Sequence, residues 1–277
     1  MLPLTFSLIQ TNLFWEDKQA NLLMLEEKIN SIKEKTEIIV LPEMFSTGFS
    51  MQPQLFAETM NDTCIGWMKK IATTKKIILT GSLMIKENEA FYNRLIWMLP
   101  NGQFGYYDKR HCFAYAEEDK HYTAGNKRLI AQAKGWKINL QVCYDLRFPI
   151  WARQTQKDSN HFPSPKEEGA QRADEVEYDI LLYVANWPEK RNHAWKTLLT
   201  ARAIENQCYV IGVNRTGNDA NNIYHSGDSM VINPLGEVLY TKAHEEDIFT
   251  ITLNKEDLIT IRNKFPFLND ADNFKIL

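Results

Sequence analysis

The 277-residue chain lacks the features that mark several large classes of protein. It contains no apolar run of about 18 residues, so no transmembrane helix is expected. Positions 1 to 9 have neither a basic start nor a small-residue cleavage site, and we read them as a strand. The net charge is only −3, which gives no electrostatic reason to expect nucleic-acid binding. No Gly-x-Gly-x-x-Gly follows a strand and no P-loop is present, which disfavours nucleotide-cofactor enzymes.

Cysteine is also scarce, with four residues in the chain. Cys64, Cys112, Cys143 and Cys208 form no Cys-x-x-Cys pair, and no histidine spacing around them suggests zinc. We therefore expect neither a disulfide framework nor a metal site. This usage fits a reduced, cytoplasmic protein. Cys112 and Cys208 are interpreted as packing residues, and Cys64 falls in the helix expected near 60–75.

Cys143 differs from the others because of the pattern around it. Residues 136–142 alternate between apolar and polar, which predicts a half-buried strand that stops at Cys143. A turn and a helix beginning near Pro149 follow. A thiol at such a corner can be exposed above the sheet edge, where backbone N–H groups are expected to favour the thiolate. The alternative is a cysteine that only fills the core.

Two charged residues also follow predicted strand ends. Glu43 comes directly after an apolar run that is closed by Pro42, since proline cannot continue a central strand. Lys109 follows a short aromatic strand at 104–107. Taken alone, each is most simply a solvated surface charge. Together with Cys143 they form a complementary set of carboxylate, ammonium and thiol.

The segments around these three residues resemble those of the nitrilase superfamily of carbon–nitrogen hydrolases, which places a Glu, a Lys and a Cys on three separate strand ends. The resemblance runs nearly end to end, and its finer part is to bacterial omega-amidases (2-oxoglutaramate amidases). The run Tyr-Val-Ala-Asn-Trp-Pro carries most of that finer likeness. The matching segments are 41–45, 47–49, 107–113, 122–126, 142–149, 183–188, 201–207 and 227–236.

The resemblance implies an α/β fold, a four-layer α-β-β-α sandwich with two mixed β-sheets, in one domain over 1–277. It also implies homodimers or larger homo-oligomers. Alternating strands and helices agree with this architecture. The polar stretch 154–176 looks like an insertion, either a surface loop, a flap over the pocket or a subunit contact. Strands are expected near 4–10, 37–41, 77–83, 93–99, 104–107, 136–142, 179–185, 208–213, 228–232 and 248–253, and helices near 17–35, 60–75, 148–156 and 190–206.

The resemblance further implies how the residues act. Cys143 would attack an amide carbonyl and form a thioester, with Glu43 as the base. Lys109 and the backbone N–H of Tyr144 would stabilise the negatively charged oxygen of the intermediate. Glu118 aligns with a second glutamate that the family uses beside the lysine. The alternative for Glu118 is an exposed acid in an acidic patch.

Residues for substrate specificity are expected near these groups. Phe45 and Trp187 are expected to wall the pocket. Arg191 is the candidate for the distal carboxylate of the substrate, because guanidinium binds carboxylate through two hydrogen bonds. We interpret Asp145 and Arg147 as holding the corner rather than touching the substrate. For Trp187 and Arg191 the alternatives are plain core packing and a surface position.

The resemblance therefore predicts hydrolysis of the terminal amide of small dicarboxylate monoamides, such as 2-oxoglutaramate and 2-oxosuccinamate, to the acid and ammonia. The expected partner is a small-molecule amide, with no cofactor. One alternative is an N-carbamoyl-amine hydrolase or nitrilase with the same Glu-Lys-Cys site. Another is a non-catalytic binding module, which the presence of all three residues disfavours.

Overall fold

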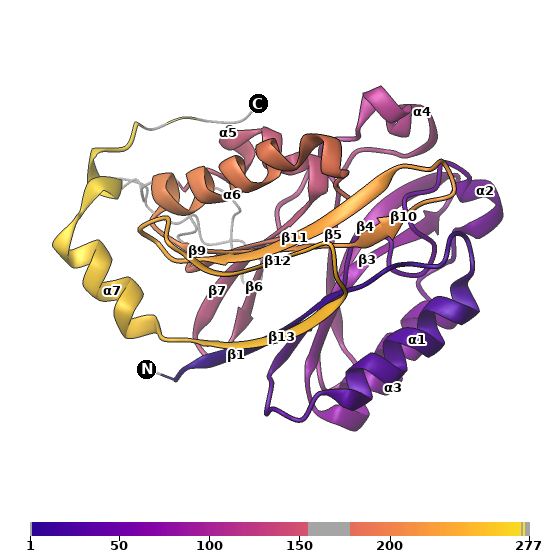
Figure 1. The fold of residues 1–277 in the computed structure, drawn as a ribbon, viewed down its shortest axis with the longest axis horizontal. Coiled ribbons are helices and arrows are strands. Elements are labelled where there is room, and N and C mark those ends of the chain that lie inside the picture. The colour runs from indigo at the N-terminus through magenta and orange to yellow at the C-terminus, as the bar shows by residue number, and fades with distance from the viewer. Residues whose placement is uncertain (1, 155–177, 273, 275–277) are drawn as a thin grey trace, which may run out of the picture.

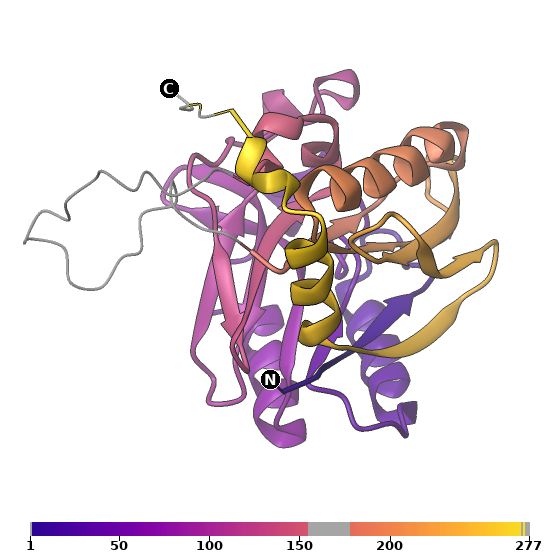
Figure 2. The ribbon, with the colours of Figure 1, turned by 90° about the vertical axis from the view of Figure 1, so that its left-hand side faces the viewer.

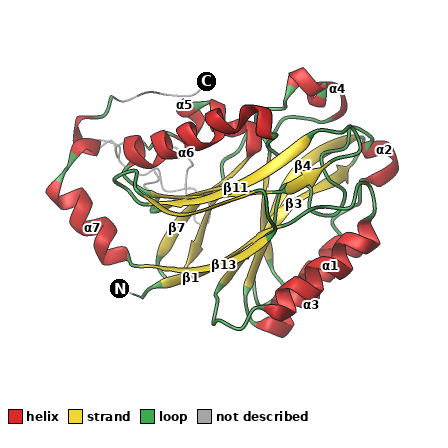
Figure 3. Ribbon diagram, viewed as in Figure 1, coloured by secondary structure: helices red, strands yellow, loops and turns green. Residues whose placement is uncertain are grey.

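The computed structural model describes residues 2–154, 178–272 and 274 (Figure 1). The expected insertion at 154–176 therefore lies, except for Gln154, outside the described residues. Two sheets face each other in the described part, and they carry helices on their outer faces (Figures 1 and 3).

The first sheet has six strands in the order β13-β1-β2-β3-β4-β5. Its centre, β1 to β3, is parallel, and its other pairs are antiparallel, so the sheet is mixed. The strands are β1 (Leu4–Gln10), β2 (Ile38–Val40), β3 (Ile78–Glu87), β4 (Ala90–Met98), β5 (Phe104–Asp108) and β13 (Asp247–Leu253).

The second sheet has seven strands, in the order β10-β11-β9-β8-β7-β6 with β12 paired to β11. It is mixed too, because only β7, β8 and β9 run parallel to one another. The strands are β6 (Ile130–Ala133), β7 (Trp136–Val142), β8 (Ile180–Ala185), β9 (Tyr209–Asn214), β10 (Thr216–Asn218), β11 (Tyr224–Ile232) and β12 (Val238–Ala243).

Helices cover the outer faces of both sheets (Figures 1 and 2). Helices α1 and α3 pack together beside the first sheet, while α6 lies over β9 and β11 of the second. The α-helices are α1 (Lys18–Ser31), α2 (Pro53–Phe56), α3 (Thr63–Lys75), α4 (Glu118–His121), α5 (Pro149–Ala152), α6 (Asn192–Asn206) and α7 (Lys255–Lys264). The 3-10 helices are η1 (Ala114–Ala116), η2 (Cys143–Arg147), η3 (Glu189–Arg191) and η4 (Phe267–Asp270).

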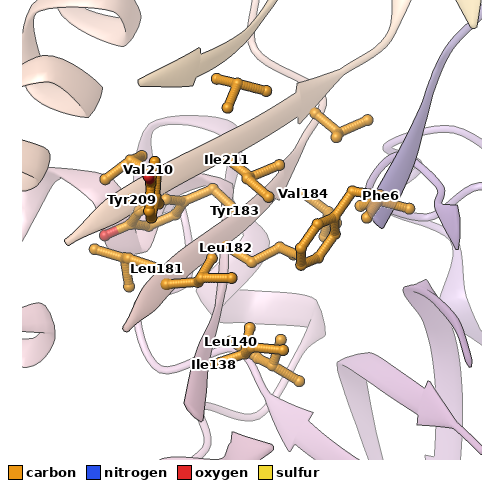
Figure 4. Packing of buried hydrophobic residues seen from close by; sticks show 14 of the residues in the cluster. Phe6, Ile138, Leu140, Leu181, Leu182, Tyr183, Val184, Tyr209, Val210 and Ile211 are labelled. Atoms are coloured by element: carbon orange, nitrogen blue, oxygen red, sulfur yellow. The ribbon is translucent and has the colours of Figure 1, made fainter. Parts of the chain in front are cut away.

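The core between the two sheets is built from alternating apolar side chains. Phe6 of β1 faces Leu140 and Val184 of the second sheet, and all three are fully buried (Figure 4). A separate core lies under α1, where Leu25 and Ile29 repeat at helical spacing. Burying each such side chain stabilises the fold by about 1.5–3 kcal/mol. The expected α-β-β-α sandwich is therefore confirmed.

All ten expected strands are present, but the sequence analysis missed the strands β6, β10 and β12 and the helices α2, α4 and α7. These elements are half exposed, and only Leu258 of α7 is buried, so they carry little hydrophobic periodicity. The helix expected at 148–156 is shorter, because the backbone becomes extended at Arg153 and α5 ends at Ala152. Among the described residues, no helix is long and apolar enough to cross a membrane.

Candidate active site

The three sequence-predicted site residues come together at the carboxyl ends of strands from both sheets. Glu43 lies three residues beyond the end of β2, and Lys109 directly follows β5. Cys143 directly follows β7 and begins η2. Glu118 joins them as the first residue of α4. The structure therefore brings together four groups, of which only Lys109 and Glu118 are near one another in the sequence.

The ammonium of Lys109 lies between the two carboxylates. Its Nζ donates to Glu43 Oε1 at 3.0 Å and to both oxygens of Glu118, at 3.0 Å and 2.8 Å. All three side chains have at most 1% of their surface exposed. Buried charges persist only when they are paired and hydrogen-bonded, as these are. The alternative of an exposed, solvated Glu118 is therefore wrong.

Hydrogen-bond donors surround the two carboxylates. The amide nitrogen of Asn93 donates to Glu43 Oε1 at 2.8 Å and to Glu118 Oε1 at 3.3 Å. The backbone N–H of Asn186 donates to Glu43 Oε2 at 2.7 Å, and that of Phe113 donates to Glu118 Oε2 at 2.5 Å. Every one of these contacts favours the ionised form of a carboxyl group.

Left-handed backbone occurs at or beside three of the four groups. Cys143 itself has a φ of 45°, Met44 after Glu43 has 44°, and Glu117 before Glu118 has 59°. Non-glycine residues rarely adopt this region, and such strain is concentrated at functional sites. The turns re-aim the chain immediately beyond a strand or before a helix. They explain how side chains from separate elements can point at one centre.

Asp145 holds the corner that carries Cys143, as the sequence analysis expected. Its buried carboxylate accepts hydrogen bonds from Val142 N at 3.0 Å and from the Tyr107 hydroxyl at 2.8 Å. It also contacts the backbone N–H and the ring Nδ1 of His111, at 3.0 Å and 2.7 Å. One carboxylate thus ties η2 to the loop that carries Lys109.

The charges in the cluster influence one another strongly. Burial alone would lower the pKa of Lys109, but the charges of Glu118 and Glu43 together raise it well above its usual range. Burial raises the pKa of Glu118; Lys109 opposes this rise and Glu43 adds to it. Lys109 therefore stays an ammonium throughout the neutral range.

The resting Cys143 is a thiol. Burial and the negative charge of Glu43 raise the pKa of Cys143 well above its usual range, although Lys109 opposes them. The expectation that backbone N–H groups at the corner favour the thiolate is therefore wrong, because desolvation and two nearby carboxylates outweigh them. Cys143 needs a base close to it, and Glu43 is near enough for its charge and side chain to raise the pKa of the thiol.

A cavity of about 270 Å³ opens onto Cys143. Its wall is mainly apolar, with five aromatic side chains and a few charged groups, which is typical of small-molecule sites. Three expected residues, Tyr144, Trp187 and Arg191, lie in its lining. The full lining is Phe49, Phe113, Tyr115, Ala116, Cys143, Tyr144, Arg147, Asn186, Trp187, Pro188, Arg191, Asp219, Ile223 and His225.

Phe45 does not contribute to the cavity, contrary to expectation. It is completely buried in the core under α1 and α3, with its ring 5.9 Å from that of Trp67. The left-handed turn at Met44 directs Phe45 away from Cys143. Phe49 takes its place in the wall, beneath the Lys109 ammonium at 5.1 Å.

Arg147 corrects a second expectation, because it lines the cavity instead of only bracing the corner. Its guanidinium lies over the ring of Trp187 at 5.1 Å, and that of Arg191 lies over Phe113 at the same distance. Neither guanidinium forms an ion pair with any residue in the described ranges. Two cationic groups are therefore presented by aromatic supports in one cavity.

The sequence analysis missed the hairpin formed by β10 and β11. Its residues Asp219, Ile223 and His225 complete the cavity wall. Burial and the charge of Arg215 lower the pKa of His225 to about 4. The imidazole of His225 is therefore uncharged at neutral pH. The only available signal was His225 itself, two residues before the segment 227–236 that carried the resemblance.

Comparison with known proteins gives consistent matches over the chain. Residues 5–263 match the carbon–nitrogen hydrolase family. The chain is 40% identical to the omega-amidase YafV of Escherichia coli K12, with 99% of this chain and 98% of that protein aligned. It is 30% identical to the 2-oxoglutaramate amidase of Bacillus subtilis strain 168, over 96% of each.

Two solved structures are also similar to this chain. XC1258 of Xanthomonas campestris, a CN-hydrolase superfamily protein with an arsenic adduct in its active site, superposes with a TM-score of 0.92 at 37% identity, over 100% of both chains. Nit3 of Saccharomyces cerevisiae, a nitrilase superfamily member, superposes with a TM-score of 0.79 at 23% identity, over 95% of this chain and 94% of that chain. The second likeness concerns the fold alone.

Proposed function

This chain belongs to the carbon–nitrogen hydrolase family, and we propose that it hydrolyses the terminal amide of small dicarboxylate monoamides to the acid and ammonia. The substrates we propose are 2-oxoglutaramate and 2-oxosuccinamate. Relatives named omega-amidase and 2-oxoglutaramate amidase, aligned nearly end to end, support this class. The observation that carries the proposal is the buried cluster of Glu43, Lys109, Glu118 and Cys143 beside a small cavity.

The first half of the reaction forms a thioester. Glu43 takes the proton from the Cys143 thiol as the sulfur attacks the amide carbon. The carbonyl oxygen becomes negative and is stabilised by Lys109 and by the N–H of Tyr144, which lies in the first turn of η2, where helical N–H groups have no partner within the helix. The carbon–nitrogen bond then breaks, and Glu43 passes its proton to the departing nitrogen as ammonia leaves.

The second half releases the acid. Glu43 takes a proton from a water molecule whose oxygen attacks the thioester carbon. The carbon–sulfur bond breaks, and Cys143 recovers a proton from Glu43, so the site returns to its starting state. Glu118 stays bound to Lys109 and keeps the ammonium pointed at the reacting oxygen. Losing one oxyanion donor of this kind typically raises the barrier by about 2.7–4 kcal/mol.

The size and the charged lining of the cavity suit a small anionic substrate. Its volume of about 270 Å³ suits an amide of a few carbons rather than a peptide or polymer. Arg147 and Arg191 are both available to the distal carboxylate, opposite the amide at Cys143. Guanidinium groups that rest on aromatic rings keep their hydrogen-bonding edges free for a carboxylate.

We also propose that residues 1–277 form a single hydrolase domain and that two copies associate as a homodimer. A core that extends between the two sheets supports the first statement. Exposed apolar side chains on the outer side of α5 and α6 support the second.

Ammonia release from a panel of compounds tests the function. The panel contains 2-oxoglutaramate, 2-oxosuccinamate, an N-carbamoyl amine and a nitrile. We expect turnover of the first two, and a loss of about 10³-fold or more in Cys143→Ala, because the nucleophile is removed. Circular dichroism and thermal unfolding of that variant check that its fold is retained.

Other outcomes of this panel would redirect the proposal. Carbon dioxide released together with ammonia would identify a carbamoyl-amine hydrolase. Turnover of the nitrile but not of the amides would identify a nitrilase. Undiminished ammonia release by folded Cys143→Ala would reject the thioester mechanism itself.

A further inference from the structure

Asn93 on β4 contacts three of the four site residues, Glu43, Glu118 and Lys109. It does so with both its side chain and its backbone. Its side-chain nitrogen donates to Glu43 Oε1 at 2.8 Å and to Glu118 Oε1 at 3.3 Å. Its backbone oxygen accepts a hydrogen bond from Lys109 N at 3.0 Å. The side chain is almost completely buried, so these contacts are made away from solvent.

The two N–H groups of this amide are fully used, but its oxygen is not. Asn93 Oδ1 is buried and has no hydrogen-bond partner among the described residues. Turning the amide over would place that oxygen against two carboxylates, which only accept hydrogen bonds when ionised. An unsatisfied buried acceptor is destabilising, so the donors of Asn93 must matter more than its acceptor.

The charges in the cluster explain why a neutral donor is useful. Glu43 and Glu118 carry two negative charges when ionised, while Lys109 carries the single positive charge between them. Two carboxylates that share one site tend to keep a proton, because both cannot easily ionise together. Asn93 adds an N–H to each carboxylate and adds no charge.

Two more titratable groups border the cluster, and both are neutral in the working range. Burial and the charge of Glu118 raise the pKa of Cys112 to about 12, and the same two causes raise that of Tyr122 further. The thiol of Cys143 is protonated at rest. The groups near Asn93 that can carry charge in this range are therefore the two glutamates and the lysine.

We propose that Asn93 is a positioning residue that holds Glu43 and Glu118 apart, and ionised together, around one ammonium. With Asn93 in place, each carboxylate accepts an N–H bond, and Glu43 is held where it can accept the proton of Cys143. The inference rests on the proposed function only in the role it gives to Glu43 as base.

The test replaces the amide and follows the pH dependence of the site. Asn93→Leu removes both donors at similar size, while Asn93→Ser retains one hydroxyl donor. Hydrogen bonds favour the ionised form of a carboxyl group, so losing those from Asn93 favours a proton on the glutamate pair, and the site then needs a higher pH to work. The acid limb is the part of the pH–rate profile in which the rate rises with pH. Its midpoint should move to a higher pH by about one unit in Asn93→Leu and by less in Asn93→Ser.

Two readouts report that limb. One is kcat/KM for ammonia release, and the other is the rate at which iodoacetamide alkylates Cys143, followed by mass spectrometry of its peptide. Alkylation requires no substrate. A shifted alkylation limb in a protein that releases no ammonia from the panel would remove the proposed function and leave the role of Asn93 standing.

Thr80→Val is the matched control, because Thr80 is buried on the neighbouring strand β3 and its hydroxyl has no partner among the described residues. Its limb should coincide with that of the wild type. The proposal would be overturned if the acid limb of Asn93→Leu lay at the same pH as in the wild type and only its thermal stability were reduced. Asn93 would then be a structural residue. If Asn93→Leu does not fold, the same outcome in Asn93→Ser would overturn it.

Discussion

Among the described residues, Arg147 and Arg191 carry the only guanidinium groups in the cavity lining. We expect them to determine the preference for an anionic substrate. A charge-assisted hydrogen bond is worth about 1.5–3 kcal/mol. Arg147→Met or Arg191→Met should therefore lower kcat/KM for 2-oxoglutaramate by about 10- to 100-fold, mainly through a higher KM. Steady-state kinetics of ammonia release measure this effect.

A neutral amide provides the control for both arginines. Butanamide has no carboxylate, so its kcat/KM should change little in either variant. Equal losses for the neutral and the anionic amide would contradict a carboxylate-binding role and would point to collapse of the aromatic supports Trp187 and Phe113.

At the scale of single residues, the resemblance implied which side chains would meet, but not where every neighbour would point. Glu43, Lys109 and Cys143 each follow a strand end, and strand ends are visible in the pattern. Phe45 was misplaced because the left-handed turn at Met44 has no sequence signal. The prediction for Arg147 was wrong because η2 is a 3-10 helix, in which residues i and i+3 lie on the same side. Arg147 therefore lines the cavity together with Tyr144, three residues earlier.

At the scale of elements, the corner after β7 depends on Asp145. In Asp145→Ala, two buried donors, the N–H of Val142 and the Tyr107 hydroxyl, lose their acceptor, as do two part-buried contacts of His111. Each unsatisfied buried group costs about 1–3 kcal/mol. We expect the free energy of unfolding to fall by at least about 2 kcal/mol. A displacement of the sulfur by about 1 Å should also reduce kcat by about 100-fold. Urea unfolding and steady-state kinetics measure the two effects.

The opposite end of the same strand supplies a matched variant. Asp179 accepts a hydrogen bond from Lys137 N at 2.8 Å and pairs with Lys255 at 2.7 Å, far from the cavity. Asp179→Ala should also lower stability but leave kcat and the alkylation rate of Cys143 unchanged. Equal kinetic losses in the two aspartate variants would show that general destabilisation is the cause, and the role of Asp145 would be refuted.

Elements with strong periodicity were predictable, and elements at the edges of the molecule were not. Strand β7 alternates cleanly in sequence, and its apolar face meets the inter-sheet core. Asn139 and Gln141 on its other face are buried too, so the expected half-buried strand is wrong in this respect. Strand β12 and helix α7 are largely exposed, so burial imposes no pattern on their residues. The resemblance supplied the two-sheet arrangement, since periodicity alone does not tell which strands share a sheet.

At the scale of the whole molecule, the outer side of α5 and α6 stands out as apolar. Ile150 of α5 is 55% exposed, and Ile204 of α6 is 52% exposed. Arg153 joins the ends of the two helices through a hydrogen bond to the backbone oxygen of Glu205. Gly236 packs closely against Ile204 and brings the exposed Leu235 to the same side. Exposed apolar side chains gathered on one side of a molecule mark candidate interaction sites.

We therefore expect a homodimer formed through the α5–α6 face, the surface that carries Ile150, Ile204 and Leu235. Size-exclusion chromatography with light scattering should give twice the 32.3 kDa mass of one chain. Ile204→Asp should shift the protein to the monomer, because a buried unpaired carboxylate opposes association. Leu23→Asp is the control, since Leu23 is 63% exposed on α1, on the other outer layer, and this variant should stay dimeric. A wild-type monomer at micromolar concentration, or equal behaviour of the two variants, would refute this interface.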